Sequence, residues 1–420
     1  MGRLWRDEVG ATAVITALVL TTMIGFTALG VEVGMWYGER RSMQTASDAA
    51  ALGAAYKIYE DGKGVSGIST AGETEATRNG YTDGENSVSL TVNSPPTQGP
   101  STGNDYAAEA ILTKQQSPLL ASLFHKDDVT IGTRSVAVVR VTGPFCVLAL
   151  SPTNDSSLKF GGTSDLNLEN CGIIVDSNSA SAMALIGASV VGATYADITG
   201  GYTKSNNSTL DLDDGMPNTG EDPLDDPFAD LDVPPGAGCD HTNFKVQKNG
   251  TDTIYPGRYC GGITVNAGAV LTMNPGNYII AGGQFNVAGG ATVNGDGVTI
   301  FLTTDGSSYA QVTINGGAVV NLKAPTAGDY KGIVFFQSRG APIADTGAQN
   351  KFNGGSTMEI NGAIYIPNQK LEFSGGNASA GGCTRIVAYT IEFTGNSDVD
   401  SDCTGYGFDE ETRRKPKLTE

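Results

Sequence analysis

The chain has 420 residues, among them 57 Gly and 17 Pro, and its formal net charge is −19. An acidic chain lacks the basic surface that general nucleic-acid binding requires. A hydrophobic content of 39% argues against a wholly disordered chain, and the glycines follow no strict three-residue period, which excludes collagen.

The first predicted element is a membrane-spanning helix over residues 9–31, preceded by a short N-terminus at residues 1–8. Val9 to Val31 contains no charged residue over 23 positions. As a helix it measures about 34 Å, against a hydrocarbon core of about 30 Å. A buried core helix and a cleaved secretory signal remain as alternatives, although the apolar region of a signal is normally shorter.

A helical stalk is expected over residues 32–57, where strong helix formers occur without proline. Apolar and small side chains recur there about every seven residues, and small residues allow a partner helix to approach closely. A solvated stalk is the alternative. Glu32, at the end of the apolar run, is expected either to pair with a partner's charge or to face lipid headgroups. The predicted helix-packing interface comprises Trp36, Met43, Ala46, Ala50 and Gly53.

Three blocks in this region carry a resemblance to a known family. They are Arg6-Asp7-Glu8-x-Gly10-Ala11, Gly30-Val31-Glu32-Val33-Gly34-Met35-Trp36-Tyr37, and Arg40-Arg41-x-Met43-Gln44-x-Ala46-x-Asp48-Ala49-Ala50-Ala51-Leu52. Together they resemble the N-terminal segment of the TadE/TadG-like Flp pilus-assembly proteins. The resemblance implies a bacterial inner-membrane anchor, a periplasmic or cell-surface C-terminal part, and other pilus-assembly proteins or pilins as partners.

The sequence differs from the related pilins at one position. Those pilins carry Glu at the fifth residue after the Gly at which they are processed, whereas Ile15 follows Gly10 here at that spacing. We therefore expect the anchor to be retained.

Residues 58–145 are expected to form a small α+β region. Residues 58–106 are rich in Gly, Ser, Thr and Asn and indicate loops, with one strand at 87–92. Residues 107–124 are expected to be helical in part, and residues 127–141 to contain a strand. His125 stands alone beside charged residues and is interpreted as a surface residue.

Residues 146–408 repeat a short motif of alternating apolar residues followed by a Gly-containing corner. Clear copies begin at Ile263, Phe285 and Val312, and Val265 lies 22 residues before Val287. Three short strands in 20 to 27 residues predict a mainly β protein whose outer part is a parallel β-helix, expected to be right-handed. Gly and Asn would supply the positive φ of its corners. A β-sandwich with long loops is the alternative.

All the cysteines lie in this outer region. They fall into three pairs whose members are 25, 21 and 20 residues apart, close to one turn of the repeat, so the two cysteines of each pair are expected to form a disulfide. Disulfides form in oxidising compartments, which places the outer region outside the cytoplasm and residues 1–8 inside. The predicted pairs are Cys146–Cys171, Cys239–Cys260 and Cys383–Cys403.

Residues 211–232 carry nine acidic residues and no basic one, and are interpreted as a solvated loop. Ca²⁺ binding is the alternative, although the order of its residues fails the EF-hand pattern. Residues 409–420 are expected to be a disordered tail. No metal site or cofactor is predicted.

The sequence therefore predicts a non-enzymatic structural or accessory component of Flp pilus assembly. A surface adhesin or glycan-binding rod is the second hypothesis, because outward Asn and Thr residues could contact sugars. A polysaccharide-acting enzyme is the third, but the outward positions of the repeats hold Asn, Thr, Ser and Gly rather than clustered carboxylates.

Overall fold

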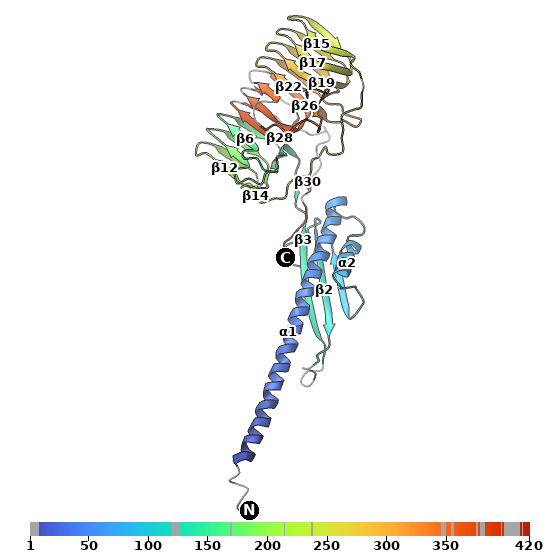
Figure 1. Cartoon of the computed structure of the whole chain (residues 1–420), viewed down its shortest axis with the longest axis vertical. Coiled ribbons are helices and arrows are strands. Elements are labelled where there is room, and N and C mark those ends of the chain that lie inside the picture. Colours follow the sequence, from blue (N-terminus) through green and yellow to red (C-terminus); the bar gives the residue numbers. More distant parts are fainter. Residues whose placement is uncertain are drawn as a thin grey trace, which may run out of the picture. The chain divides into compact units, whose positions relative to one another are not determined.

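The computed structural model of the chain divides into two units, Met1–Val141 with Arg413–Glu420, and Thr142–Thr412. Figure 1 shows the elements of both units. The structure describes residues 8–119, 122, 127–168, 170–213, 215–236, 238–345, 350–353, 357–374, 377–378, 383–395, 397–398, 412–413 and 415–420.

The first unit combines two helices with a four-stranded antiparallel sheet. Helix α1 spans Glu8–Asp61 and helix α2 spans Ile68–Arg78. The strand order is β1-β2-β3-β31, and both neighbours of β2 pair with it antiparallel. The strands are β1 (Val88–Asn93), β2 (Ala107–Gln116), β3 (Val129–Val138) and β31 (Lys417–Leu418).

Two elements of the region expected to be α+β differ from the prediction. Residues 68–78, expected as loop, form α2, which buries Ile68, Gly72 and Ala76. Residues 107–116, expected as helix, form β2. Its partners on both sides satisfy its backbone groups, and this tertiary pairing outweighs local helix propensity.

The prediction of a disordered tail was also wrong for the described residues 415–420. Lys417 and Leu418 pair with Val138 and Ala137 at the edge of β3. The Glu420 carboxylate binds the Arg134 guanidinium at 2.5 Å. An open strand edge and a partly buried cation thus order a charged segment that composition alone assigns to solvent.

Short strands also occur where the chain crosses between the units: β4 (Val141–Thr142) and β30 (Thr412–Arg413) form a two-stranded sheet.

The second unit stacks parallel strands in three arrays. One turn of the chain, which contributes a stretch of strand to each array in succession, makes what we call a rung. Array 1 contains, in spatial order, β15 (His241–Val246), β17 (Gly257–Val265), β19 (Gly276–Val287), β21 (Val298–Thr303), β24 (Ile333–Gln337), β26 (Thr357–Ser374), β28 (Thr384–Thr394), β5 (Phe145–Ala149), β8 (Gly172–Val175), β11 (Ala196–Ile198) and β14 (Asn218–Thr219).

Array 2 uses the later halves of the long strands. It contains parts of β15, β17 and β19, then β22 (Gln311–Ile314), β25 (Asn350–Asn353), parts of β26 and β28, β6 (Leu158–Gly161), β9 (Met183–Leu185) and β12 (Tyr202–Lys204).

Array 3 contains β16 (Thr251–Ile254), β18 (Val270–Met273), β20 (Thr292–Asp296), β23 (Val319–Lys323), the start of β26, β27 (Asn377–Ala378) and β29 (Ser397–Asp398). A three-stranded sheet of β7 (Asp165–Leu168), β10 (Val190–Ala193) and β13 (Thr209–Leu212) continues it, with β7 in contact with β29.

The predicted repeat coincides with the observed register. Val265 pairs with Val287, and Val287 pairs with Ile314. Gly268, Gly290 and Gly317, the corner glycines of the three clear copies, have positive φ values of 70°, 74° and 79°, as a tight left-handed corner requires. The protein is mainly β with parallel pairing, which argues against the antiparallel sandwich.

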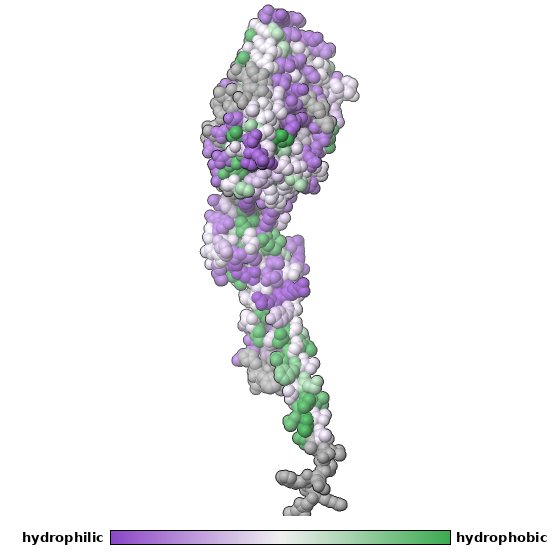
Figure 2. Space-filling model, turned by 90° about the vertical axis from the view of Figure 1, so that its left-hand side faces the viewer, coloured by the Kyte–Doolittle hydropathy of each residue, from purple (hydrophilic) through white to green (hydrophobic). Residues whose placement is uncertain are grey.

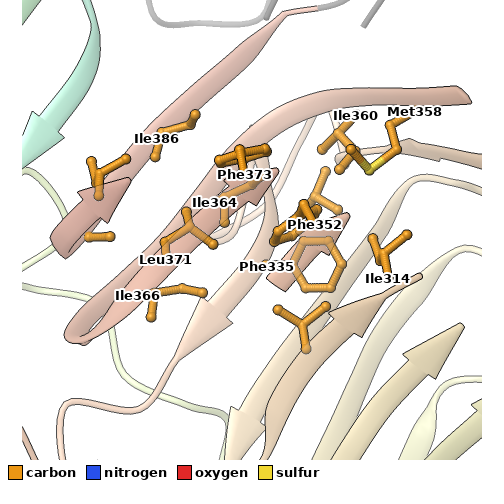
Figure 3. Packing of buried hydrophobic residues seen from close by; sticks show 14 of the residues in the cluster. Ile314, Phe335, Phe352, Met358, Ile360, Ile364, Ile366, Leu371, Phe373 and Ile386 are labelled. Atoms are coloured by element: carbon orange, nitrogen blue, oxygen red, sulfur yellow. The ribbon is translucent and has the colours of Figure 1, made fainter. Parts of the chain in front are cut away.

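Inward-facing side chains of the arrays form one hydrophobic core (Figure 3). Aromatic rings continue from rung to rung in array 2: Phe352 stacks on Phe373 at 4.9 Å, Phe373 on Phe393 at 5.3 Å, and Phe393 on Phe160 at 5.4 Å between ring centroids. Identical positions in successive rungs lie one above the other, so the repeat in sequence becomes a ladder in space.

The order of the rungs in space differs from their order in the chain. The first rung, which begins with β5, pairs with β28 of the last rung, and Figure 1 shows β28 beside β6. The chain leaves this junction through β8, β11 and β14. It then returns at the opposite end of the stack, at β15.

Residues 220–240 connect these two ends, and we call this segment the strap. Array 1 has eleven strands from β14 to β15, hence ten steps of about 4.8 Å, or about 48 Å. The 21 residues of the strap reach about 69 Å when extended, at about 3.3 Å per residue. The segment is therefore long enough to run along the whole stack with some slack.

Candidate functional site

The N-terminal part of α1 is apolar and solvent-exposed. Over residues 12–31 nearly every side chain is exposed, and Leu18 and Phe26 are 66% and 72% accessible. Figure 2 shows apolar residues along this helix. The hydroxyls of Thr21 and Thr22 donate to the carbonyls of Ala17 and Leu18, four residues earlier, so they present no free donor. This segment is a candidate membrane span by length and composition.

The following part of α1 is packed on its own unit. Met43, Ala46 and Ala50 of the predicted interface are fully buried, and Trp36 is partly buried against the same core. At Gly53, a Cβ atom would lie 2.6 Å from Glu75 Cγ of α2. The small residues do admit a helix at close range, but that helix is α2 of the same chain.

This placement corrects the expectation of an open interface for a separate protein. The buried members of the stripe contact the sheet and α2, and Thr133 of β3 reaches the Met43 carbonyl. Sequence reasoning assigned α2 to a loop, so it had no intramolecular partner to offer the stripe. The spacing of Ile68, Gly72 and Ala76 at four-residue intervals, which places them on one helical face, was the signal in the sequence that could have found α2.

Glu32 lies where the exposed and packed parts of α1 meet. It is only 3% accessible, and its Oε1 accepts a hydrogen bond from the Leu119 backbone N–H at 2.6 Å. Leu119 itself is 73% exposed. The carboxylate thus joins α1 to the segment after β2, rather than serving only as an interfacial charge.

Beside this contact, α1 and β3 line a shallow groove. Its walls combine aromatic, cationic and backbone surface. The lining residues are Val33, Trp36, Tyr37, Arg40, Thr130, Ile131 and Gly132.

A buried carboxylate organises the far side of the sheet. Glu109 of β2 is inaccessible to solvent and receives the Arg134 Nε at 2.6 Å, the Thr97 hydroxyl at 2.7 Å and the Asn93 amide at 3.0 Å. Burial alone raises the pKa of Glu109, but the hydrogen bonds from these three groups outweigh it and lower the pKa to about 2. This is a structural network rather than an acid–base site.

The strap is held on array 1 of the second unit. Tyr365 donates its hydroxyl to Asp226 Oδ2 at 2.6 Å, and the Phe228 ring packs edge-on against Tyr365 at 5.1 Å. The Arg339 guanidinium donates to the carbonyls of Phe228 and Leu231. Burial, together with the Asp226 carboxylate, raises the pKa of the Tyr365 phenol.

These contacts correct the interpretation of residues 211–232 as a solvated loop. Phe228 is 8% exposed, and the Leu224 backbone N–H binds Asp176 Oδ1 at 2.9 Å. The sequence carried a signal, because residues 333–336 of array 1 are continuously apolar, whereas Gln311–Ile314 alternates polar and apolar residues. In the structure every position of Ile333–Gln337 is buried. A strand buried on both faces needs a cover, and here the strap provides it.

Within the described part of the chain, no group of three or more His, Cys, Asp or Glu side chains is placed to hold a metal ion. His241 is exposed and stacks on Tyr259 at 4.7 Å. His125 lies outside the described residues.

Two of the predicted disulfides are present. Cys146 pairs with Cys171 and Cys239 pairs with Cys260, each with a Cα–Cα distance of 5.7 Å. Each bond joins neighbouring rungs of array 1 or its entry. Cys383 is buried at the start of the last rung, and Cys403 lies outside the described residues, so that pairing stays a prediction.

The first unit thus contains one continuous helix that is apolar and exposed in its first part, a candidate membrane span, and packed on a sheet in its second. Residues 10–57 match the family model described as putative Flp pilus-assembly TadE/G-like. The match covers both parts of α1 and confirms the resemblance over this segment. No curated protein and no solved structure matches the chain.

Proposed function

We propose that this protein is a membrane-anchored, non-enzymatic structural component of Flp pilus assembly. The observation that carries the proposal is the coincidence of the family match at residues 10–57 with the exposed apolar part of α1 and its packed continuation. A pilus-assembly segment and a candidate membrane span on the same helix support a role beside the assembly machinery in the membrane.

The proposal includes an orientation in the bacterial inner membrane. Residues 1–8 face the cytoplasm, and both units beyond the anchor lie in the periplasm or at the cell surface. The two disulfides of the second unit support this, since such bonds persist in oxidising compartments.

We further propose that the second unit is a parallel β-helix that serves as a stiff spacer or platform. In-register parallel pairing in three arrays and the continuous aromatic ladder support this architecture. Stacked rungs pair their backbone groups with one another along the whole length, which favours a rigid element.

Fractionation of cells that produce the full-length protein tests the function. We expect intact protein in inner membranes, digestion of the second unit by protease added to spheroplasts with an intact inner membrane, and loss of piliation when the gene is deleted. Normal piliation in the deletion strain would contradict the proposal. Protein recovered in sheared filaments would show instead that the chain joins the pilus.

A surface adhesin that binds glycans is the second candidate. Its supporting observation is a shallow groove on array 3, lined in part by Asn294, Asn321 and Lys323. Some of the hydrogen-bonding groups in this groove already bind one another, because the Asn321 amide donates to Asn294 Oδ1 at 2.9 Å. Binding of the purified protein to a glycan array, abolished by Asn321→Ala, would favour this candidate.

A further inference from the structure

We propose that the surface of α1 that follows its apolar part binds the phosphates of anionic phospholipids. Arg40 and Arg41 form this site beside Trp36 and Tyr37. The inference rests on the proposed membrane anchoring and adds a ligand and a site to it. Its occupant is the headgroup layer of the bilayer that holds α1.

The first observation is the position of the two arginines along the helix. Met35 is the last aliphatic residue of the exposed stretch, at 59% accessibility, and Tyr37 is 69% exposed. Arg40 and Arg41 follow within about 9 Å along the axis, at about 1.5 Å per residue. The headgroup layer on each side of the hydrocarbon core is about 5–8 Å deep, and the long arginine side chains would reach back into it.

The second observation is that the two side chains have no partner within the described part of the chain. Both arginine side chains are exposed, and among the described residues neither has an ion pair or side-chain hydrogen bond. The nearby carboxylates are engaged elsewhere: Glu39 binds Lys114 Nζ at 2.6 Å, and Glu32 accepts the Leu119 N–H. Two guanidinium groups therefore remain available, with a geometry suited to phosphate oxygens.

The third observation is the groove that adjoins Arg40. Trp36 and Tyr37 line it from α1, and Ile131 and Gly132 line it from β3. Aromatic rings of this kind favour the membrane–water interface, where one face is apolar and one edge is wet. A phosphate at Arg40 would place the glycerol and upper acyl chain against these rings.

The fourth observation is an exposed apolar side chain at the end of the anchor, about 12 Å along the helix axis before Arg40. Leu119 is 73% exposed, and its backbone is tied to Glu32 at the end of the anchor. An apolar side chain in that place suits the boundary between headgroups and acyl chains. An acidic partner protein would satisfy the arginines, but it would leave this apolar surface unexplained.

The experiment uses the full-length protein in nanodiscs and reads the fluorescence of Trp36. The chain has two tryptophans, so a Trp5→Phe background leaves Trp36 as the single reporter. Brominated phosphatidylglycerol and brominated phosphatidylcholine are compared as quenchers at equal mole fraction. We expect preferential quenching by phosphatidylglycerol, reflecting at least about fivefold enrichment at the site, since one Arg near an anionic surface changes partitioning by about that factor.

Three variants make the test specific. Arg40→Gln with Arg41→Gln removes the preference, whereas Arg40→Lys with Arg41→Lys retains most of it through charge. Arg78→Gln is the matched control, because Arg78 is an exposed guanidinium on α2 that sits in a local pair with Glu75. It leaves the preference unchanged. Circular dichroism of each variant confirms that the fold is intact.

The outcomes separate the two proposals. Equal quenching by both lipids in the parent protein, or a preference that survives the double Gln variant, would overturn the lipid site while leaving the anchor intact. Absence of quenching by either lipid would contradict membrane anchoring itself. If the double Gln variant kept its lipid preference but lost piliation, the arginines would serve a protein partner instead, and the lipid proposal would be wrong.

Discussion

At the scale of single residues, buried charge in this protein serves structure. Glu109 is enclosed in the first unit and receives donors from Asn93, Thr97 and Arg134. Arg134 in turn binds Glu420 from the end of the chain. A buried carboxylate is tolerated because its oxygens are all occupied, and the cost of removing one partner is correspondingly high.

We predict that the first unit loses stability in acid through Glu109. The folded pKa is about 2 against an ordinary value of 4.5, so the contribution is complete above pH 4.5 and disappears as the pH falls to 2. It amounts to at most about 3 kcal/mol. Amide exchange of β2 and β3 measures this loss of stability. It is followed in detergent-solubilised protein between pH 7 and 2.5, with correction for intrinsic exchange rates.

Glu109→Gln provides the comparison. This variant should be destabilised at pH 7, because its amide opposes the Arg134 guanidinium, and its stability should change less with acid than that of the parent protein. Equal acid sensitivity in both proteins would assign the effect to other carboxylates.

At the scale of elements, helix α1 has two parts whose surfaces differ in chemistry. The part before Glu32 presents apolar side chains outward, and the part after it buries small residues against α2 and the sheet. Glycine matters at Gly53 and Gly72 because the two helices approach there: a Cβ on Gly72 would lie 3.0 Å from the Ala50 carbonyl oxygen.

We predict that Ala50→Leu destabilises the first unit. Ala50 of α1 is fully buried against the rest of the first unit. The larger leucine side chain overpacks this contact, which lowers the free energy of unfolding by about 1–3 kcal/mol. Thermal unfolding followed by circular dichroism measures the change. Thr45→Leu, on the exposed side of the same helix, is the control and should stay close to the parent protein. Wild-type stability in the Ala50 variant would contradict the observed packing.

The strap yields a second prediction at this scale. Arg339→Ala removes donors to the Phe228 and Leu231 carbonyls and leaves Asp226 without its cation. We expect local destabilisation of about 2–3 kcal/mol, seen as faster amide exchange in residues 221–236 with the rung core unchanged.

Lys248→Ala changes an exposed cation at the end of the stack and is the matched control. A uniform rise in exchange over the whole second unit after Arg339→Ala would show that this residue supports the rungs rather than the strap.

At the scale of the molecule, the order of rungs in the second unit brings the two ends of its chain segment together in the middle of the stack. Its first and last rungs are neighbours, joined by Lys159 Nζ to Glu392 Oε1 at 2.6 Å and by the Phe160–Phe393 stack. Burial acts to raise the pKa of Glu392, but the two lysines that bind it, Lys159 and Lys370, lower it. The ends of the stack are therefore formed by rungs from the middle of the chain.

We predict that cysteines replacing Lys159 and Glu392 cross-link. These positions are register partners in adjacent strands, about 4.8 Å apart, which is within disulfide reach. Peptide mapping after mild oxidation detects the bond. Cysteines at Lys159 and Glu372 are the control, because Glu372 lies one rung further away and beyond reach. Cross-linking of the control pair but not the test pair would contradict the observed rung order.

The sequence alone determined those features of the protein that depend on interactions between residues close together in the chain. The uncharged run at 9–31 defines an apolar helix by its length, and the repeat in array 2 set Val265, Val287 and Ile314 in register because identical environments recur at each turn. The two observed disulfides followed from the same period.

The tertiary structure alone decided which distant segments meet. The partner of the small-residue stripe, the pairing of the tail with β3, the cover over array 1 and the junction of first and last rungs all join residues far apart in the chain. Local periodicity defines which faces of an element are apolar, but not which segment buries them. That choice depends on the relative free energies of whole arrangements, and it appears only when the chain is folded.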